Sequence, residues 1–257
     1  SFLISKNCNL HCHYCGHMDY NGLGEGTIEK SMNLDDIKTI EKKILDLGLK
    51  FNQIEVFGGE PTINPQFDII TEYLSTRRGI LYDKLKLFTN GLNMTKRVGK
   101  VLKYYDHIDF SIYPITSESV NEYQKVWNES KISNNLKNTF IMFHTRHDFY
   151  HTIEWELPVD ADIQKIFGGC FLKDNCRMVT VDGIYRCSYL HHEKTEIYKF
   201  DRKILEEKFI TNPHEPPKYC SQCHVAKGIY LQQEKTTNPG DIRISSHDIK
   251  KYFEKII

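Results

Sequence analysis

Strand-like apolar runs alternate with amphipathic, helix-like segments through the first two thirds of the chain. In the segment 34–47, leucine and isoleucine recur at helical spacing, and Asn33 can cap its start. Repeated strand–helix alternation implies a parallel sheet with right-handed crossovers, closed fully or partly into a barrel. The expected strands are 2–4, 54–57, 85–89, 108–112, 140–145 and 153–157, and the expected helices are 34–47, 67–75, 95–104 and 117–127.

Six such units fit before the second group of cysteines begins, and eight do not. The sequence therefore predicts an α/β fold with a partial (β/α)6 TIM-like barrel. Residues 1–160 form the predicted barrel domain. Residues 161–257 form a predicted small domain built on a β-hairpin, helices and cysteines.

Composition excludes several classes of function. Lysine plus arginine and aspartate plus glutamate both total 34, so the formal net charge is zero and nothing indicates a nucleic-acid partner. No apolar stretch approaches the roughly 20 residues that span a bilayer, and Lys6 interrupts any signal peptide. Eight clustered cysteines in a long, lysine-rich chain are typical of metal ligands in a reducing cytoplasm, so we predict a cytoplasmic protein without a membrane partner.

Three cysteines follow the first strand closely, in the spacing C-x3-C-x2-C. They are Cys8, Cys12 and Cys15. Three thiolates on one tight loop can hold three irons of a four-iron, four-sulfur (4Fe-4S) cluster, which leaves the fourth iron open to a small molecule. The alternative is a zinc site, because closely spaced cysteines are also common zinc ligands.

Unusual residues also follow the next three strands. Gly58, Gly59 and Glu60 follow the second strand, Asn90 the third, and Ser111 ends the fourth. Each could be only a turn residue or a satisfied hydroxyl. Because the carboxyl ends of parallel strands meet at the edge where β/α barrels bind ligands, their coincidence predicts a binding site.

These motifs together resemble the radical S-adenosylmethionine (radical SAM) family. The resemblance implies that Cys8, Cys12 and Cys15 hold a 4Fe-4S cluster, whose open iron is chelated by the amino and carboxylate groups of S-adenosylmethionine. The reduced cluster donates one electron, S-adenosylmethionine splits, and a 5′-deoxyadenosyl radical removes a hydrogen from the substrate. An electron donor such as flavodoxin or ferredoxin is the implied partner.

The same resemblance implies roles for the strand-end residues. Gly58, Gly59 and Glu60 look like the family's Gly-Gly-Glu motif, which hydrogen-bonds the amino group of S-adenosylmethionine mainly through its backbone. Asn90 and Ser111 match positions that contact the ribose or carboxylate. Tyr14 matches the aromatic position that packs near the adenine.

The remaining cysteines flank a predicted hairpin at 178–187, where Asp182-Gly183 is a strong two-residue turn signal. This group resembles the twitch domain, the shortened relative of the SPASM extension, and the resemblance implies one auxiliary 4Fe-4S cluster. The favoured ligands are Cys170, Cys187, Cys220 and Cys223, with Cys176 as a substitute. A zinc site of Cys187, Cys220 and Cys223 with His224 or Cys170 is the alternative.

The size of the chain and its single twitch-like domain resemble the aminocyclitol dehydrogenases, which oxidise a secondary alcohol to a ketone. The resemblance implies a small-molecule substrate and an auxiliary cluster that accepts an electron. A chain that starts at its first strand favours this reading over a peptide-modifying maturase or epimerase, whose substrate is a peptide. A zinc-stabilised sensor that binds S-adenosylmethionine is the non-enzymatic alternative.

Candidate catalytic residues follow the fourth and fifth strands. Tyr113 and Arg146, with His144 and His147 beside the latter, lie where they could bind a hydroxyl or carboxylate or take a proton. A solvated charged loop is the alternative interpretation.

Overall fold

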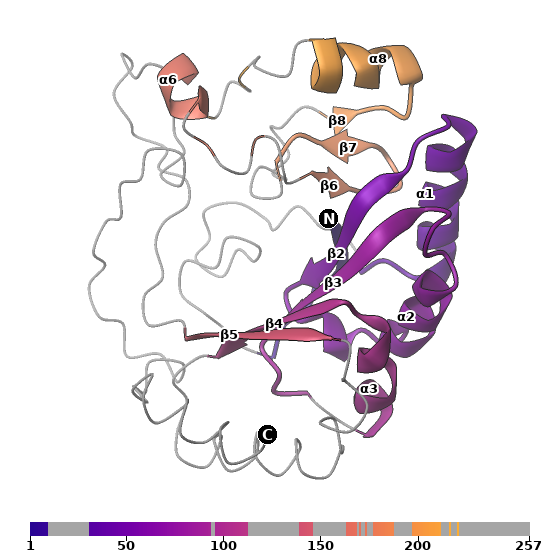
Figure 1. Ribbon diagram of the computed structural model, residues 1–257, viewed down its shortest axis with the longest axis vertical. Coiled ribbons are helices and arrows are strands. Elements are labelled where there is room, and N and C mark those ends of the chain that lie inside the picture. The colour runs from indigo at the N-terminus through magenta and orange to yellow at the C-terminus, as the bar shows by residue number, and fades with distance from the viewer. Residues whose placement is uncertain are drawn as a thin grey trace.

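The computed structural model shows a mixed α/β fold with a central parallel sheet, consistent with a partial TIM-like core (Figure 1). This confirms the predicted fold class. The predicted sixth strand, 153–157, and the predicted helix 117–127 lie outside the residues that the structure describes. Those residues are 1–9, 31–93, 96–112, 139–145, 163–168, 170, 173, 177–187, 197–211, 216 and 220.

Five strands run parallel in the order β5-β4-β3-β2-β1, so each strand neighbours the next along the chain. This is the arrangement that right-handed β/α crossovers produce. The strands are β1 (Phe2–Ser5), β2 (Phe51–Gly58), β3 (Tyr82–Thr89), β4 (His107–Ile112) and β5 (Phe140–Thr145).

Helices cover one face of this sheet (Figure 1). Asn33 caps the first helix as predicted: its side chain accepts a hydrogen bond from the Asp36 backbone, and the Asp36 carboxylate accepts one from the Asn33 backbone, both at 2.9 Å. Such a reciprocal pair satisfies two backbone donors at the helix start. The elements are α1 (Leu34–Asp46), the 3-10 turn η1 (Pro61–Ile63), α2 (Phe67–Ser75), α3 (Lys96–Val101) and the 3-10 turn η2 (Leu102–Tyr104).

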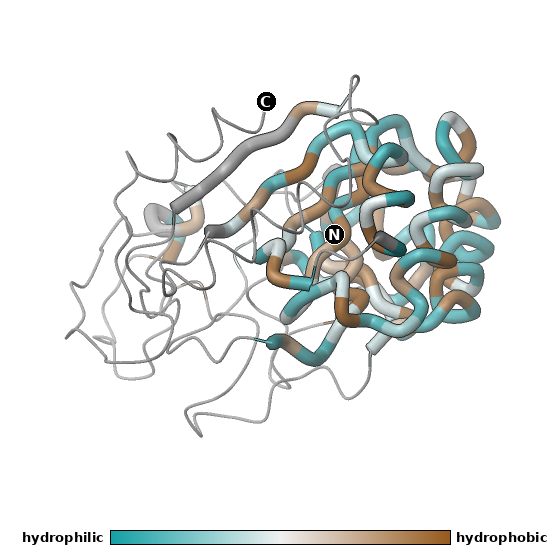
Figure 2. The backbone as a smooth tube through the Cα atoms, turned by 90° about the horizontal axis from the view of Figure 1, so that it is seen from below, coloured by the Kyte–Doolittle hydropathy of each residue, from teal (hydrophilic) through white to brown (hydrophobic). Residues whose placement is uncertain are grey.

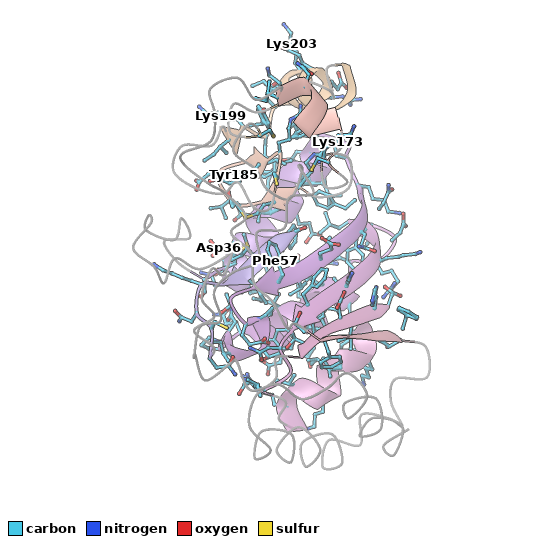
Figure 3. The ribbon with its side chains drawn as sticks, turned by 90° about the vertical axis from the view of Figure 1, so that its left-hand side faces the viewer. Asp36, Phe57, Lys173, Tyr185, Lys199 and Lys203 are labelled. Carbon is cyan, nitrogen blue, oxygen red and sulfur yellow. The ribbon has the colours of Figure 1, made fainter. Side chains whose placement is uncertain are left out.

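Alternate strand residues face the two sides of the sheet. Ile54, Val56 and Leu87 pack in the main core, which includes α1 and α2. Leu3 and Phe57 belong to a second apolar cluster with Met178 from the C-terminal part. Figure 2 shows hydrophobic and hydrophilic residues alternating along these elements, and Figure 3 labels Phe57. Burial on both faces is typical of parallel sheets, so the strand ends remain as the place for polar groups.

The C-terminal part extends the same sheet, because β6 pairs with β1 in parallel, with Phe2 opposite Val179. β7, which carries Tyr185 (Figure 3), and β8 follow as antiparallel neighbours. The elements are α6 (Ile163–Gly168), β6 (Met178–Val179), β7 (Ile184–Tyr185), β8 (Ile197–Tyr198), α8 (Arg202–Glu206) and the π-helical turn η3 (Glu207–Thr211).

The hairpin exists, but the predicted two-residue turn is wrong. Val179 pairs with Ile184, so four residues form the loop, and the Thr180 backbone donates to Gly183 O at 2.9 Å. Position 183 instead requires glycine because no side chain fits there: a Cβ would lie 2.5 Å from Ile197 Cγ2 and from Tyr198 O. β8 therefore packs closely against the end of this loop.

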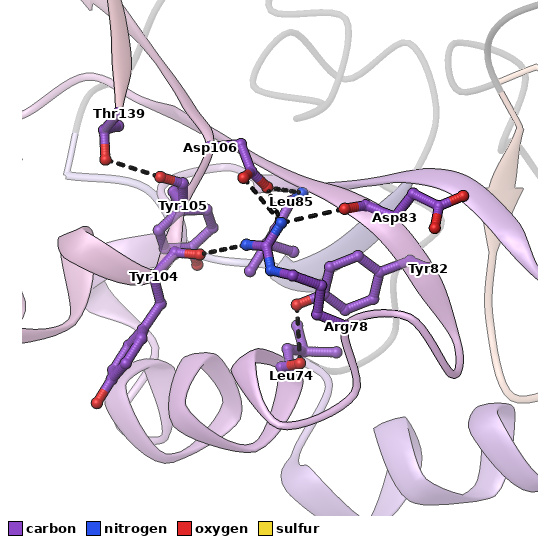
Figure 4. A network of polar contacts seen from close by, with 9 residues as sticks. All are labelled: Leu74, Arg78, Tyr82, Asp83, Leu85, Tyr104, Tyr105, Asp106 and Thr139. Carbon is purple, nitrogen blue, oxygen red and sulfur yellow. Dashed lines mark hydrogen bonds and ion pairs between the residues drawn. The ribbon is translucent and has the colours of Figure 1, made fainter. Parts of the chain in front are cut away.

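A cluster of polar contacts lies where strands β3 and β4 begin, at the amino-terminal ends of the strands (Figure 4). Arg78 donates to both carboxylate oxygens of Asp106, at 2.8 and 2.6 Å, and to the carbonyls of Asp83 and Tyr104. Asp106 also accepts from the Leu85 backbone at 2.7 Å. One planar guanidinium thus joins β3 to the chain that enters β4.

We expect Arg78→Lys to lower the free energy of unfolding by about 1 kcal/mol, because an ammonium cannot reproduce the forked contact with a carboxylate and two carbonyls. Chemical denaturation measures this. Lys42→Gln is the matched control, since Lys42 makes only an exposed pair with Asp46 on α1, and about 0.5 kcal/mol or less is expected. Equal losses in the two variants would contradict the structural role of Arg78.

Among the described helices, none combines the length and the apolar character that crossing a membrane requires.

Candidate active site

The chain that leads to Cys8 is fastened to the end of β2. Beyond the last paired residues of β1, the Gly59 backbone donates to Ser5 O at 2.9 Å and the Glu60 backbone donates to Asn7 O at 2.8 Å. These two bonds extend the parallel pairing past the strands and onto the cysteine loop. Cys8, which is half-buried, is thereby held beside the Gly-Gly-Glu segment.

Two glycines make this approach sterically possible. A Cβ on Gly58 would lie 2.4 Å from Ser5 O. A Cβ on Gly59 would lie 2.4 Å from Asn7 O and 3.0 Å from the Cys8 Cβ. Neither glycine has a positive φ, so their role is close backbone approach and not an unusual conformation.

The carboxylate of Glu60 is a hub that joins the ends of β2 and β3. Its side chain is fully buried. Oε1 accepts from the Thr62 backbone (3.1 Å), the Thr62 hydroxyl (2.6 Å) and the Thr89 hydroxyl (2.6 Å), while Oε2 accepts from the Asn90 backbone at 2.7 Å. Four donors around one buried carboxylate fix two loops relative to each other.

Burial raises the pKa of Glu60 above 4.5, although the hydrogen bonds from Thr62, Thr89 and Asn90 act in the opposite direction. A carboxyl whose folded-state pKa is raised binds its proton more tightly when folded. Its protonation therefore stabilises the fold at low pH, and that stabilisation is lost as the pH rises through the folded-state pKa.

Asn90 connects this hub to the cysteine loop. Its Nδ2 donates to Asn9 Oδ1 at 2.7 Å and lies 3.9 Å from Cys8 Sγ, within hydrogen-bond range for sulfur. Gly91 follows with φ of 73°, in the left-handed region that glycine adopts readily, so the predicted Asn-Gly turn is present. Ser111, which was predicted to end β4, is its second-to-last residue, and it lies in register with His144 on β5.

The structure thus brings together four of the predicted site residues, namely Cys8, Gly59, Glu60 and Asn90. The amide nitrogens of Gly59 and Glu60 are donors to the cysteine loop, whereas the ammonium of S-adenosylmethionine requires acceptors. The carbonyl groups of this motif are acceptors, and their contact with the ammonium of S-adenosylmethionine remains a prediction. The predicted site residues Cys12, Tyr14, Cys15, Tyr113 and Arg146 lie outside the described residues.

The donor chemistry at Cys8 fits an iron–sulfur cluster. A cysteine thiolate with an amide donor beside it is the usual environment of a cluster sulfur, and the contacts of Gly58 and Gly59 leave no room for side chains on that side. Within the described part of the chain, no three His, Cys, Asp or Glu side chains are grouped to hold a metal ion. Cys12 and Cys15, the other two predicted ligands, lie outside the described residues.

In the C-terminal part, Cys220 is buried beside Phe167, and Cys187 packs against the same cluster. Cys170 lies three residues after Phe167 and its backbone donates to Phe167 O at 3.1 Å. Cys176 and Cys223 lie outside the described residues. Two of the five predicted auxiliary ligands thus pack in the Phe167 cluster, and a third, Cys170, hydrogen-bonds to the Phe167 backbone. The ligand set remains a prediction.

Sequence reasoning missed several residues that hold the site together. Asn64 is buried and its Nδ2 donates to Ile4 O and Met32 O, at 2.5 and 2.9 Å, which joins β1 to the entry of α1. Thr62, Thr89 and Asn9 contact Glu60 or Asn90. Their only sequence signal is proximity to the motifs, because hydrogen bonds between distant loops leave no periodic pattern.

Known proteins resemble this chain in sequence and in fold. Among curated proteins, the GTP 3′,8-cyclase of Haemophilus ducreyi is 28% identical over 136 residues, which are 52% of this chain but only 37% of that protein. Among solved structures, BtrN in complex with AdoMet and 2-DOIA has a TM-score of 0.52 at 15% identity, covering 86% of this chain and 82% of BtrN. AnSMEcpe with bound AdoMet and Kp18Cys peptide also scores 0.52 at 15% identity, covering 98% of this chain and 95% of that one.

At these identities the two solved structures establish only the fold. The family model described as "Radical SAM superfamily" matches residues 2–143, which is more than half of the chain and includes Cys8, Glu60 and Asn90. The chain therefore belongs to the radical SAM superfamily.

Proposed function

We propose that this enzyme oxidises a small substrate and that a second, C-terminal cluster accepts the electron released. The observation that supports this proposal is the continuous sheet: β6 pairs with β1, the strand that leads to Cys8, and β7 leads directly to Cys187. One hydrogen-bonded sheet therefore joins the segments that carry the two cysteine groups. Cys8 follows the carboxyl end of β1, and Cys187 follows β7, which is antiparallel to β6, at the opposite end of the strands. A rigid connection of this kind would keep the separation between the two centres constant, as electron transfer between them requires.

The cysteines have distinct proposed roles. Cys8, Cys12 and Cys15 would hold the cluster that binds S-adenosylmethionine. The cluster and S-adenosylmethionine together would supply the radical that removes a hydrogen atom from the substrate. The auxiliary ligands would be Cys170, Cys187, Cys220 and Cys223, with Cys176 as the substitute. Glu60 holds the loops after β2 and β3 together, and Asn90 holds the second of these loops against Cys8.

Oxidation of an alcohol to a ketone removes one hydrogen atom, one electron and one proton. S-adenosylmethionine accounts for the hydrogen atom, and the auxiliary cluster would take the electron. The proton needs an acceptor near the substrate, for which the imidazoles of His144 and His147 are the proposed candidates. Arg146 and Tyr113, as neighbours of the ends of β5 and β4, would bind the hydroxyl group of the substrate.

The experiment that tests this proposal is the iron, sulfide and zinc content after anaerobic reconstitution. About eight irons per chain with matching sulfide are expected for two 4Fe-4S clusters, and about four in each of Cys8→Ser and Cys187→Ser. About four irons with one zinc in the unaltered protein would contradict an auxiliary cluster and favour a structural zinc site.

A peptide substrate is the second candidate. It is favoured by the likeness to anSMEcpe, whose structure contains a bound peptide and covers nearly the whole of this chain. Deuterium transfer separates the candidates: the label should reach 5′-deoxyadenosine from a deuterated aminocyclitol and not from a deuterated peptide. The reverse result would establish the peptide-modifying alternative, and absence of S-adenosylmethionine cleavage would favour a binding protein without radical chemistry.

A further inference from the structure

The orientation of the Asn90 amide is fixed by its own loop. Asn90 Oδ1 accepts a hydrogen bond from the Leu92 backbone at 2.9 Å. A backbone N–H can only donate, so the atom facing Leu92 must be the oxygen. The NH2 group of Asn90 therefore faces the cysteine loop, and this assignment does not depend on the choice between two flipped amides.

Both hydrogens of that NH2 group have acceptors in the cysteine loop. Asn9 Oδ1 lies 2.7 Å from Nδ2, and Cys8 Sγ lies 3.9 Å from it. Asn90 is only 5% exposed, so little water can replace its side chain beside the sulfur. A donor in this position interacts more favourably with the sulfur as its negative charge increases.

The backbone of the same residue is anchored independently. The Asn90 N–H donates to Glu60 Oε2 at 2.7 Å, and Glu60 is held by Thr62 and Thr89. An unbroken series of hydrogen bonds thus runs from the buried carboxylate through Asn90 to the sulfur of Cys8. The donor cannot turn away from the sulfur without breaking contacts to Leu92, Asn9 or Glu60.

We propose that Asn90 is a positioning residue that donates to Cys8 Sγ and makes the reduction potential of the cluster less negative, before S-adenosylmethionine binds. This inference rests on the proposed ligation of that cluster by Cys8. Reduction adds negative charge to the cluster and its sulfurs, so a fixed donor stabilises the reduced form more than the oxidised form. It gives Asn90 a role beyond the predicted contact with the ribose or carboxylate of S-adenosylmethionine.

The test is the midpoint potential of the reconstituted protein without S-adenosylmethionine, followed by electron paramagnetic resonance. Asn90→Asp keeps the acceptor for Leu92 but replaces the donor by an anionic oxygen, and Asn90→Ala removes the donor without adding charge. Both variants should have a more negative potential, with a severalfold lower ratio of reduced to oxidised cluster at the midpoint of the unaltered protein. Asn93→Ala is the control, because the Asn93 amide lies in the same loop but donates to Thr62 O at 2.8 Å.

A second variant tests the anchor. Glu60→Gln places an NH2 group in the carboxylate site, where four donors already converge, and should shift the potential in the same direction as Asn90→Ala. Unchanged potentials in both Asn90 variants would overturn the inference, and so would a shift seen only with S-adenosylmethionine present or only in Asn90→Asp. If the unaltered protein binds no cluster, the proposed function fails instead, and the iron analysis reports this separately.

Discussion

Gly59→Ala is expected to lose most of the iron that the unaltered protein binds. Its free energy of unfolding should also fall by about 3 kcal/mol, so that it unfolds at a lower denaturant concentration. The added Cβ would lie 2.4 Å from Asn7 O, 2.7 Å from the Asn7 carbonyl carbon and 3.0 Å from the Cys8 Cβ. The first two neighbours are backbone atoms, which cannot rotate away as a flexible side chain can. Relief of the contact requires the cysteine loop to move away from β2, and overpacking of this kind is destabilising.

That movement also breaks specific hydrogen bonds. The Gly59 and Glu60 backbones would lose their acceptors, Ser5 O and Asn7 O, and Cys8 would move away from Asn90. Iron content and denaturation are therefore expected to change together. Both are measurable on one preparation, the first by chemical analysis after reconstitution and the second by circular dichroism.

Gly168→Ala is the matched control. A Cβ at Gly168, in α6, would meet nothing within 4 Å, and its φ is outside the left-handed region. This substitution should leave iron content unchanged and stability unchanged or slightly higher, because alanine restricts the unfolded chain more than glycine does. Normal iron binding by Gly59→Ala would contradict the tight fit of the cysteine loop against β2.

The sequence was sufficient to predict the parts of the fold that depend on local patterns. The apolar runs and the helical spacing in α1 correspond to burial on the faces of a parallel sheet, and the Asn33 cap depends on residues three positions apart. The beginning of β2 at Phe51 was missed because Asn52 and Gln53 are polar and exposed. Exposed residues at the start of a strand do not follow the apolar pattern by which strands are predicted.

The hairpin loop shows where local signals fail. Asp182-Gly183 favours a two-residue turn, in which both residues need a positive φ. In the structure Gly183 has no positive φ, and its missing side chain makes room for Ile197 and Tyr198 of β8. The contact joins segments fourteen or more residues apart, so tertiary packing decided a feature that the dipeptide alone could not predict.

The location of the candidate site could be predicted from the sequence, but the hydrogen bonds that hold it together could not. Placement of Gly59, Glu60 and Asn90 followed from the rule that ligand-binding residues lie at the carboxyl ends of parallel strands. The resemblance to the radical SAM family implied a backbone role for Glu60, whereas its buried carboxylate also joins two loops. That role depends on Thr89 and Asn90, about thirty residues away, and no local pattern relates them to Glu60.

Glu60→Ala should be the most destabilising substitution of a polar side chain at this site, with a loss of about 3–4 kcal/mol of unfolding free energy. Removal of the carboxylate leaves the backbone donors of Thr62 and Asn90 and the hydroxyls of Thr62 and Thr89 without their acceptor. Each unsatisfied buried donor costs about 1–3 kcal/mol before relaxation, and rotation of the two hydroxyls recovers a part of that cost. The empty volume adds a further loss.

Two comparisons make this prediction specific. Glu60→Gln preserves the volume and one acceptor oxygen, so its loss should be about half as large, and the difference measures the bonds made by the second oxygen. Glu72→Ala, an exposed carboxylate on α2, should change stability by no more than about 0.5 kcal/mol. If Glu60→Ala is as stable as Glu72→Ala, the carboxylate does not hold the loops together. Another contact would then have to hold Asn90 beside Cys8, because Glu60 is the group that accepts the hydrogen bond from the Asn90 backbone N–H.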